Sequence, residues 1–181
     1  AGVKIEPKIA LLMCSAIISD TLIFRSPTCT EMDREAGKAL AEIAGINIKE
    51  HAHEMFFAGS NISEKTAKEL FTGDFKRFSI GDTTFGIGQV SCMDGEELDQ
   101  VKKKVMTYMK EQYKSLGVNM LYFMLTDIIK PGTELLCVGD GAMELVERAF
   151  GVQGSDDVVY LPGVVSRKKQ VVPEIMMEIT Q

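Results

Sequence analysis

The sequence predicts an α/β (α+β) fold, in which a mixed sheet with flanking helices follows an all-helical segment. Residues 1–58 contain only helical patterns joined by short connections, whereas strand-like and helical segments alternate after Gly59. The chain has 181 residues, of which 45% are hydrophobic, so one ordinary domain or two small ones can form a core. We therefore expect two parts, residues 1–60 and residues 61–181.

The first part is expected to be helical throughout. An almost continuous apolar stretch with Pro7 in its first turn is typical of a buried helix. Thr30 and Asp33 have the spacing of a helix cap, and Gly45 is a typical helix stop. A core of about 58 residues is marginal when it stands alone, so this part is expected to pack on a segment outside the chain. The expected helices cover residues 7–20, 31–44 and 48–57.

The second part alternates strands and helices. Charged residues alternate with aromatic ones around Lys76, which is typical of an edge strand with one solvated face. Gly73 and Asp74 are expected to end the helix before that strand. The expected strands cover residues 75–80, 85–90, 120–126, 135–138 and 158–161, and the expected helices cover residues 63–71, 95–115 and 141–150.

Composition excludes several classes of function. The 26 acidic and 20 basic side chains give a net charge of −6, which argues against a nucleic-acid partner. No apolar run approaches the roughly 20 residues that span a bilayer, and no signal-peptide pattern opens the chain, so we expect a cytoplasmic protein without a membrane partner. The cysteines lack metal-site spacing and are expected to be buried thiols, at positions Cys14, Cys29, Cys92 and Cys137.

Residues 163–173, with the sequence GVVSRKKQVVP, place three consecutive cations between two pairs of valines. The valines are typical of a buried strand, and alternation would send Arg167 and Lys169 to one face and Lys168 to the other. One interpretation is a solvated strand end or hairpin. The other is an anion clamp, because arginine offers a planar fork and lysine a point charge that together suit a phosphate group. The residues alone leave both open.

Two further patterns have competing interpretations. Asp20 closes the most hydrophobic helix, at the end where the helix dipole disfavours an anion; Thr21 or a nearby amide could hold it, or a metal ion could bind it. His51 and His53 lie two positions apart, which is a poor spacing for a metal pair on a helix, so surface or interface histidines are favoured.

Four segments, read in order, resemble one known family. They are SAIISDTLIF at residues 15–24, SPTCT at residues 26–30, the stretch from Ala58 to Lys76, and residues 163–173. Together they are similar to the C-terminal portion of the manganese-dependent (family II) inorganic pyrophosphatases of the DHH phosphoesterase superfamily. The resemblance spans nearly the whole chain. It implies that residues 1–60 are the C-terminal helical part of a truncated DHH domain and residues 61–181 a DHH-associated substrate-binding domain.

The resemblance also implies roles for single residues. Asp20 aligns with a metal ligand, and Lys76, Arg167 and Lys168 align with cations that bind pyrophosphate, while the part of Lys169 stays open. No catalytic residue beyond the metal ligand is implied. The chain lacks a DHH triplet and an N-terminal aspartate-rich strand, so most ligands of the cofactor Mn²⁺, or of Mg²⁺ as an alternative, are expected outside it.

The implied reaction is hydrolysis of pyrophosphate to two phosphates by metal-activated water in a longer parent enzyme. This chain alone is expected to be inactive, with pyrophosphate or phosphate and the missing DHH domain as partners. The oligomeric state stays open, a homodimer included. Two alternatives remain: a related DHH phosphoesterase or exopolyphosphatase, and a non-catalytic anion-binding module.

Overall fold

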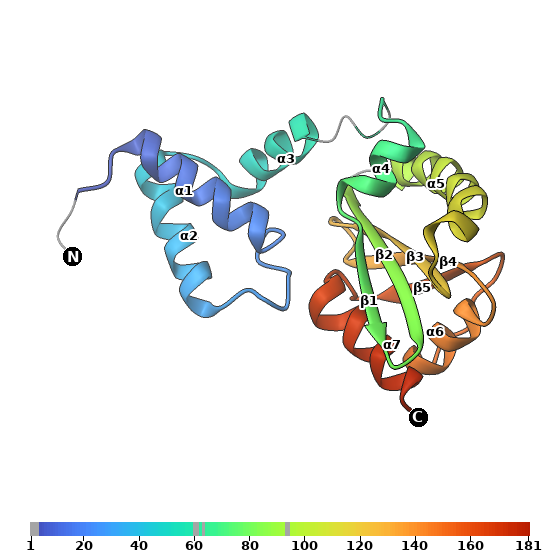
Figure 1. The fold of residues 1–181 in the computed structure, drawn as a ribbon. Coiled ribbons are helices and arrows are strands. Elements are labelled where there is room, and N and C mark those ends of the chain that lie inside the picture. The colour runs from blue at the N-terminus through green and yellow to red at the C-terminus, as the bar shows by residue number, and fades with distance from the viewer. Residues whose placement is uncertain (1–3, 60–61, 63, 93–94) are drawn as a thin grey trace. The chain divides into compact units, whose positions relative to one another are not determined.

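The computed structural model describes residues 4–59, 62, 64–92 and 95–181. The chain divides into two compact units, residues 1–60 and residues 61–181, drawn in Figure 1. That the first unit is the end of a DHH domain stays a prediction. None of the helices in the described ranges combines the length and the apolar character that crossing a membrane requires.

The first unit consists of α1 (Pro7–Asp20), α2 (Glu31–Ala44) and α3 (Ile48–Gly59), close to the predicted bounds. The predicted cap of α2 is confirmed, because the Thr30 hydroxyl accepts from the Asp33 N–H while the Asp33 carboxylate accepts from the Thr30 N–H. Gly45 ends α2 at a φ of 69°, in the left-handed region that favours glycine. Helices α1 and α2 lie side by side (Figure 1).

Within its own unit, the predicted buried helix α1 is buried on one side only. Its inner side packs on α2 and α3 in a small core, whereas Ile9, Leu12 and Met13 are 51%, 66% and 45% exposed. The other helices of this unit cover only one side of α1, so its second apolar side remains accessible. The core residues are Ala10, Cys14, Ile18, Leu40, Ala41 and Ala52.

The second unit is built around a five-stranded sheet of order β1-β2-β3-β4-β5. The pair β2 and β3 is parallel and the other neighbours are antiparallel, so the predicted mixed sheet is confirmed, with β1 at an edge. The strands are β1 (Lys76–Ile80), β2 (Thr83–Cys92), β3 (Met120–Asp127), β4 (Gly132–Val138) and β5 (Val158–Pro162). The helices are α4 (Ala67–Gly73), α5 (Gly95–Leu116), α6 (Ala142–Phe150) and α7 (Val172–Ile179).

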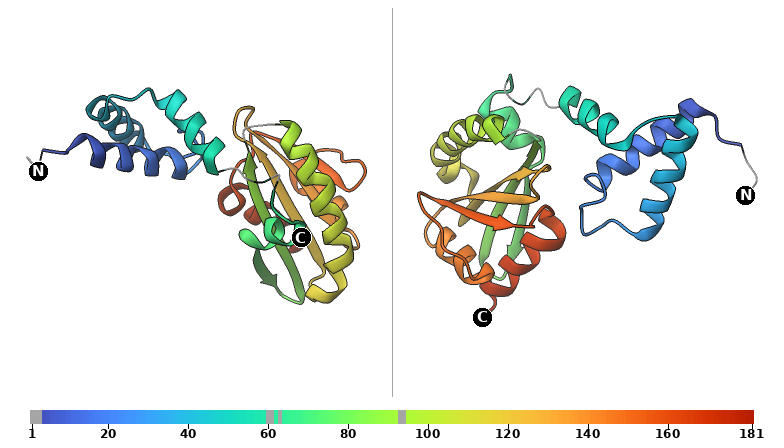
Figure 2. Two further views of the ribbon diagram at one scale, coloured as in Figure 1. Left: turned by 90° about the horizontal axis from the view of Figure 1, so that it is seen from above. Right: turned by 180° about the vertical axis from the view of Figure 1, so that it is seen from behind.

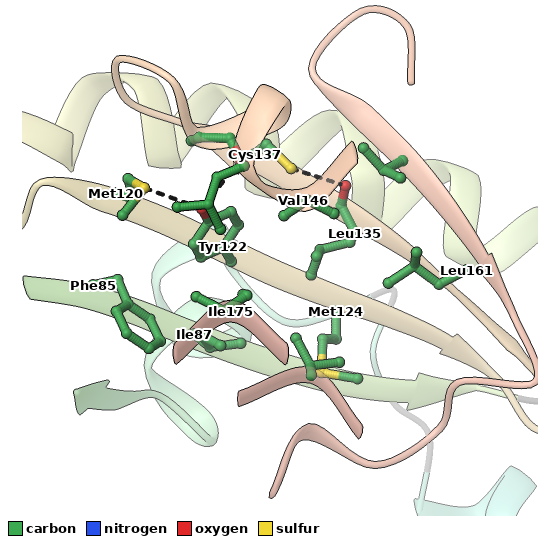
Figure 3. Close-up of a cluster of buried hydrophobic side chains, with 14 of the residues drawn as sticks. Phe85, Ile87, Met120, Tyr122, Met124, Leu135, Cys137, Val146, Leu161 and Ile175 are labelled. Carbon is green, nitrogen blue, oxygen red and sulfur yellow. Dashed lines mark hydrogen bonds between the residues drawn. The ribbon is translucent and has the colours of Figure 1, made fainter. Parts of the chain in front are cut away.

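Helices cover both faces of the sheet. The long α5 lies along one face (Figure 2) and shares a core there with α4 and the side chains of Leu121, Phe123 and Leu125. On the other face α6 and α7 pack on the core shown in Figure 3, to which Ile87 of β2 and Ile175 of α7 both belong. The two faces of the strands thus serve two separate cores.

Two predicted elements are corrected. Helix α4 begins at Ala67, because Thr66 and Glu69 form a capping box, whereas the predicted start at residue 63 lies outside the described residues. The valines of residues 163–173 do not form a strand. A helical turn runs from Arg167 to Val171 and continues into α7, so strand alternation does not place the cations.

Candidate anion-binding site

The loop before this helical turn is held by the side chain of Gln170. Its Oε1 accepts from the N–H groups of Val165 and Ser166, both at 3.0 Å, and its Nε2 donates to the carbonyl of Gly163 at 3.1 Å. The Ser166 hydroxyl in turn caps the helical turn by accepting from the N–H of Lys169 at 3.3 Å. The backbone that carries the basic residues is therefore fixed by its own neighbours.

Buried threonines tie the same loop to the sheet. The hydroxyl of Thr133 on β4 donates to the carbonyl of Val164 at 2.6 Å and lies 3.0 Å from the hydroxyl of Thr126 on β3. Because the single hydroxyl proton of Thr133 goes to Val164, Thr126 must be the donor to Thr133. This chain of hydrogen bonds joins two central strands to the loop.

Arg167 joins the helical turn to the start of β1. Its Nη1 donates to the carbonyls of Asp74 at 2.6 Å and of Ile87 at 3.2 Å, and its Nη2 donates to the Asp74 carboxylate at 2.7 Å. The Arg167 side chain is 8% exposed and that of Asp74 is 50% exposed. A buried guanidinium needs such partners, since leaving its donors unpaired is costly.

One edge of the Arg167 guanidinium remains open. Of its five N–H groups three have protein acceptors, and the other two are Nε–H and the second N–H of Nη2. Among the described residues no buried side-chain nitrogen lacks a partner, so the unpaired Nε must reach solvent. Because Asp74 bridges both Nη atoms, the two remaining N–H groups lie together on the adjacent Nε–Nη2 edge, whose spacing matches two oxygens of one phosphate group.

Lys76, on the edge strand β1, lies on the face of the sheet that α7 covers. It pairs across the ladder with Ile87, whose carbonyl accepts from Arg167, and Phe78 two residues on packs into the core beneath α7. Alternation sends Arg77 to the other face, where its Nη2 donates to the carbonyl of Leu116 at the end of α5. Strand β1 thus carries Lys76 on the α7 face and Arg77 on the other face, where Arg77 binds the end of α5.

Lys168 and Lys169 complete the basic surface. Arg167 and Val171 turn inward on the helical turn, which leaves both lysines exposed. Within the described part of the chain, neither of them nor Lys76 has an acidic side chain at ion-pair distance. The N-terminal end of the helical segment adds partial positive charge beside them. This cationic corner is the candidate anion-binding site.

Asp20 lies in the other unit, exposed at the C-terminal end of α1. Thr21 next to it is buried, and its hydroxyl donates to the Ile17 carbonyl at 2.6 Å and accepts from the Phe24 N–H at 3.1 Å. The side-chain hydrogen bonds that hold this turn come from Thr21 and not from the Asp20 carboxylate. No three His, Cys, Asp or Glu residues in the described ranges gather as a metal site, so Asp20 is not part of such a group.

The histidines have packing roles. Ser15 donates to the Leu11 carbonyl at 2.8 Å, so its short 2.7 Å contact with His51 requires an Nε2–H donor on the ring. His53 is exposed and stacks on Phe57. The favoured surface or interface interpretation thus fits His53, whereas His51 holds α3 to α1.

The cysteine prediction is correct for three of the four residues. Cys14, Cys92 and Cys137 are buried, and desolvation raises the pKa values of the Cys14 and Cys137 thiols. Cys29 is only partly buried, because it lies in the short connection before α2.

The fold and the cationic corner define an α/β domain with a basic sheet edge. The family model of the DHHA2 domain matches residues 53–177, and the chain belongs to this family. Arg167, Lys168 and Lys76 all lie within the matched range.

Relatives of known class extend the match to nearly the whole chain. A Clostridium acetobutylicum protein assigned as a manganese-dependent inorganic pyrophosphatase is 46% identical over 98% of this chain and 57% of its own length. The cobalt-dependent inorganic pyrophosphatase of Clostridium perfringens is 44% identical over 99% of this chain and 32% of its own length. The predicted resemblance is confirmed, and the chain spans little more than half the length of most such relatives.

A solved structure agrees. A crystal structure from Methanococcus jannaschii, assigned to the family II inorganic pyrophosphatases, matches with a TM-score of 0.83 and 41% identity. The match covers 100% of this chain and 59% of that protein.

Proposed function

We propose that this chain is the substrate-binding C-terminal portion of a manganese-dependent inorganic pyrophosphatase. Residues 1–60 would then be the helical end of a DHH domain and residues 61–181 the domain that binds pyrophosphate. The observation that carries the proposal is the cationic corner: Lys76 lies opposite Ile87, whose carbonyl accepts from Arg167, and Lys168 follows Arg167 on the helical turn. The names of the relatives support pyrophosphate as the anion.

The chemistry of the corner suits this substrate. Pyrophosphate is compact and highly charged, so its binding requires several cations in a small space. The open edge of Arg167 can hold two oxygens of one phosphoryl group, while the mobile ammonium groups of Lys76 and Lys168 neutralise further oxygens. The same cations would stabilise charge that develops on the leaving phosphate during hydrolysis.

The metal chemistry belongs to a longer parent. A catalytic pair of metal ions requires more ligands than the one carboxylate that Asp20 offers among the described residues. We propose Asp20 as one ligand of Mn²⁺, which supplies an activated hydroxide when bound in the parent. The residues described here bind and orient the substrate.

Two measurements test the proposed function. The purified chain should bind pyrophosphate but release no phosphate above the buffer rate when Mn²⁺ is supplied. A longer protein that contains this chain and a DHH segment should hydrolyse pyrophosphate. Rapid manganese-dependent phosphate release by the chain alone would contradict its role as a binding portion, and a marked preference of the longer protein for tripolyphosphate would favour the exopolyphosphatase alternative.

A further inference from the structure

We propose that Asp74 is a positioning residue for anion binding, which fixes the Arg167 guanidinium so that only its Nε and Nη2 edge can meet a phosphate group. This inference rests on the proposed function of the cationic corner. It assigns to an acidic residue a supporting part in a site that binds an anion.

Asp74 contacts Arg167 through both its side chain and its main chain. It follows the last residue of α4 and precedes β1, and it is 93 positions from Arg167 in the chain. Its carboxylate accepts from Nη2 at 2.7 Å, and its own carbonyl accepts from Nη1 at 2.6 Å. Two acceptors on one rigid residue hold a planar group in one orientation, because rotation of the guanidinium would break both bonds.

A fixed guanidinium has a defined advantage for binding. An arginine that is free to turn must lose rotamer freedom when the anion arrives, whereas Arg167 is ordered beforehand. The third acceptor, the carbonyl of Ile87, anchors the same group to β2. The open edge of the fork is therefore held in one orientation at the start of β1, two residues before Lys76.

The charge of Asp74 acts in the opposite sense. A carboxylate beside an anion site repels the anion, so Asp74 favours binding only if its positioning effect exceeds this repulsion. Two variants distinguish the positioning of Arg167 from the repulsion of the anion. Asp74→Asn keeps an acceptor oxygen and removes the charge, whereas Asp74→Ala removes both.

Positioning predicts that the two variants differ. The Asn variant should bind pyrophosphate as tightly as the unchanged chain or more tightly. The Ala variant should bind about tenfold more weakly although it has lost a negative charge, which is the scale of one charge-assisted hydrogen bond. Repulsion alone predicts tighter binding for both. Asp82→Ala is the matched control, because Asp82 is exposed in the turn between β1 and β2 and has no contact with Arg167.

The experiment is an NMR titration of the 181-residue chain with sodium pyrophosphate at constant ionic strength, observing the arginine Nε–Hε signals. Arg167→Lys assigns the Arg167 signal. We expect pyrophosphate to shift that signal in the unchanged chain, in Asp74→Asn and in Asp82→Ala, and to shift it only at about tenfold higher concentration in Asp74→Ala.

The outcomes are distinguishable. Equal or tighter binding by Asp74→Ala with the Arg167 signal still shifting overturns the positioning role and leaves the site intact. Absence of any shift of the Arg167 Nε–Hε signal in the unchanged chain, at any pyrophosphate concentration, overturns the proposed site itself. If Asp74→Ala loses its dispersed spectrum, Asp74→Ser replaces it, since serine keeps a small polar side chain at this position but is too short to reach Nη2.

Discussion

The hydroxyl of Thr133 donates a 2.6 Å hydrogen bond to the main-chain carbonyl of Val164, thirty-one residues further along the chain. The bond is buried and joins the centre of the sheet to the loop that carries the basic residues. Thr133→Val should lower the free energy of unfolding by about 1–3 kcal/mol, because it leaves a buried carbonyl without its donor.

Urea denaturation measures this loss. Thr107→Val is the control, since the Thr107 hydroxyl bonds within α5 at an exposed position and its loss should change stability by only about 0.5 kcal/mol. Equal changes in the two variants would show that the buried bond does not stabilise the loop.

Arg167→Ala should affect stability and binding together. The substitution removes three hydrogen bonds that join the helical turn to Asp74 and Ile87, so unfolding should become easier by about 1–3 kcal/mol. In a longer active parent it should also lower kcat/KM. The decrease should correspond to a loss of several kcal/mol of transition-state stabilisation, because a charge-stabilising donor is removed. Denaturation and steady-state kinetics check the two effects. An unchanged kcat/KM would remove Arg167 from the substrate site.

Local patterns predicted much of the fold. Helix α2 follows from the spacing of Thr30 and Asp33 and from Gly45, and the edge position of β1 follows from its alternation of charged and aromatic residues. Signals of this kind depend on neighbours within a few residues, and those neighbours are visible in the sequence.

The interior of the site could not be predicted in the same way. Val171 and Val172 have the β-branched character of a strand, and only their spacing to Ile175 shows the helical stripe that packs on the sheet. The partnership of Arg167 with Asp74 joins residues 93 positions apart, and no local pattern indicates it. The resemblance supplied Arg167 as a substrate residue but did not indicate that most of its donors bind protein.

Thiol reactivity should distinguish Cys29 from the other cysteines. Cys14, Cys92 and Cys137 are buried, and desolvation holds the pKa values of the Cys14 and Cys137 thiols above their usual range. At pH 8 the folded chain should therefore show one fast-reacting thiol with an aromatic disulfide reagent, and the remaining thiols should react after denaturation. Cys29→Ser should abolish the fast phase. Persistence of that phase in the variant would contradict the burial of the other three.

The capping box of α4 should make stability depend on pH. Hydrogen bonds from the main chain and hydroxyl of Thr66 lower the pKa of Glu69 from its ordinary value of 4.5. A lowered folded pKa means that this contribution is complete above about pH 4.5 and is lost as pH falls through the folded value.

The melting temperature of the chain and of Glu69→Gln, followed from pH 7 to pH 3, checks this sign. The two curves should converge as pH falls below the lowered folded pKa of Glu69, because both side chains are then uncharged. A constant difference across this range would show that the charged carboxylate does not stabilise α4.

The central claim is that Lys76 and Lys168, with Arg167, form an anion-binding site. Isothermal titration of pyrophosphate into the chain and into Lys76→Ala and Lys168→Ala tests it most directly, because these exposed lysines have no ion-pair partner in the described ranges and their loss should leave the fold unchanged. Each substitution should weaken binding about fivefold, which corresponds to about 1 kcal/mol for an exposed charge contact. Lys114→Ala, on the exposed side of α5, should bind as the unchanged chain does. Equal affinities in all four proteins, or no binding by the unchanged chain, would contradict the account.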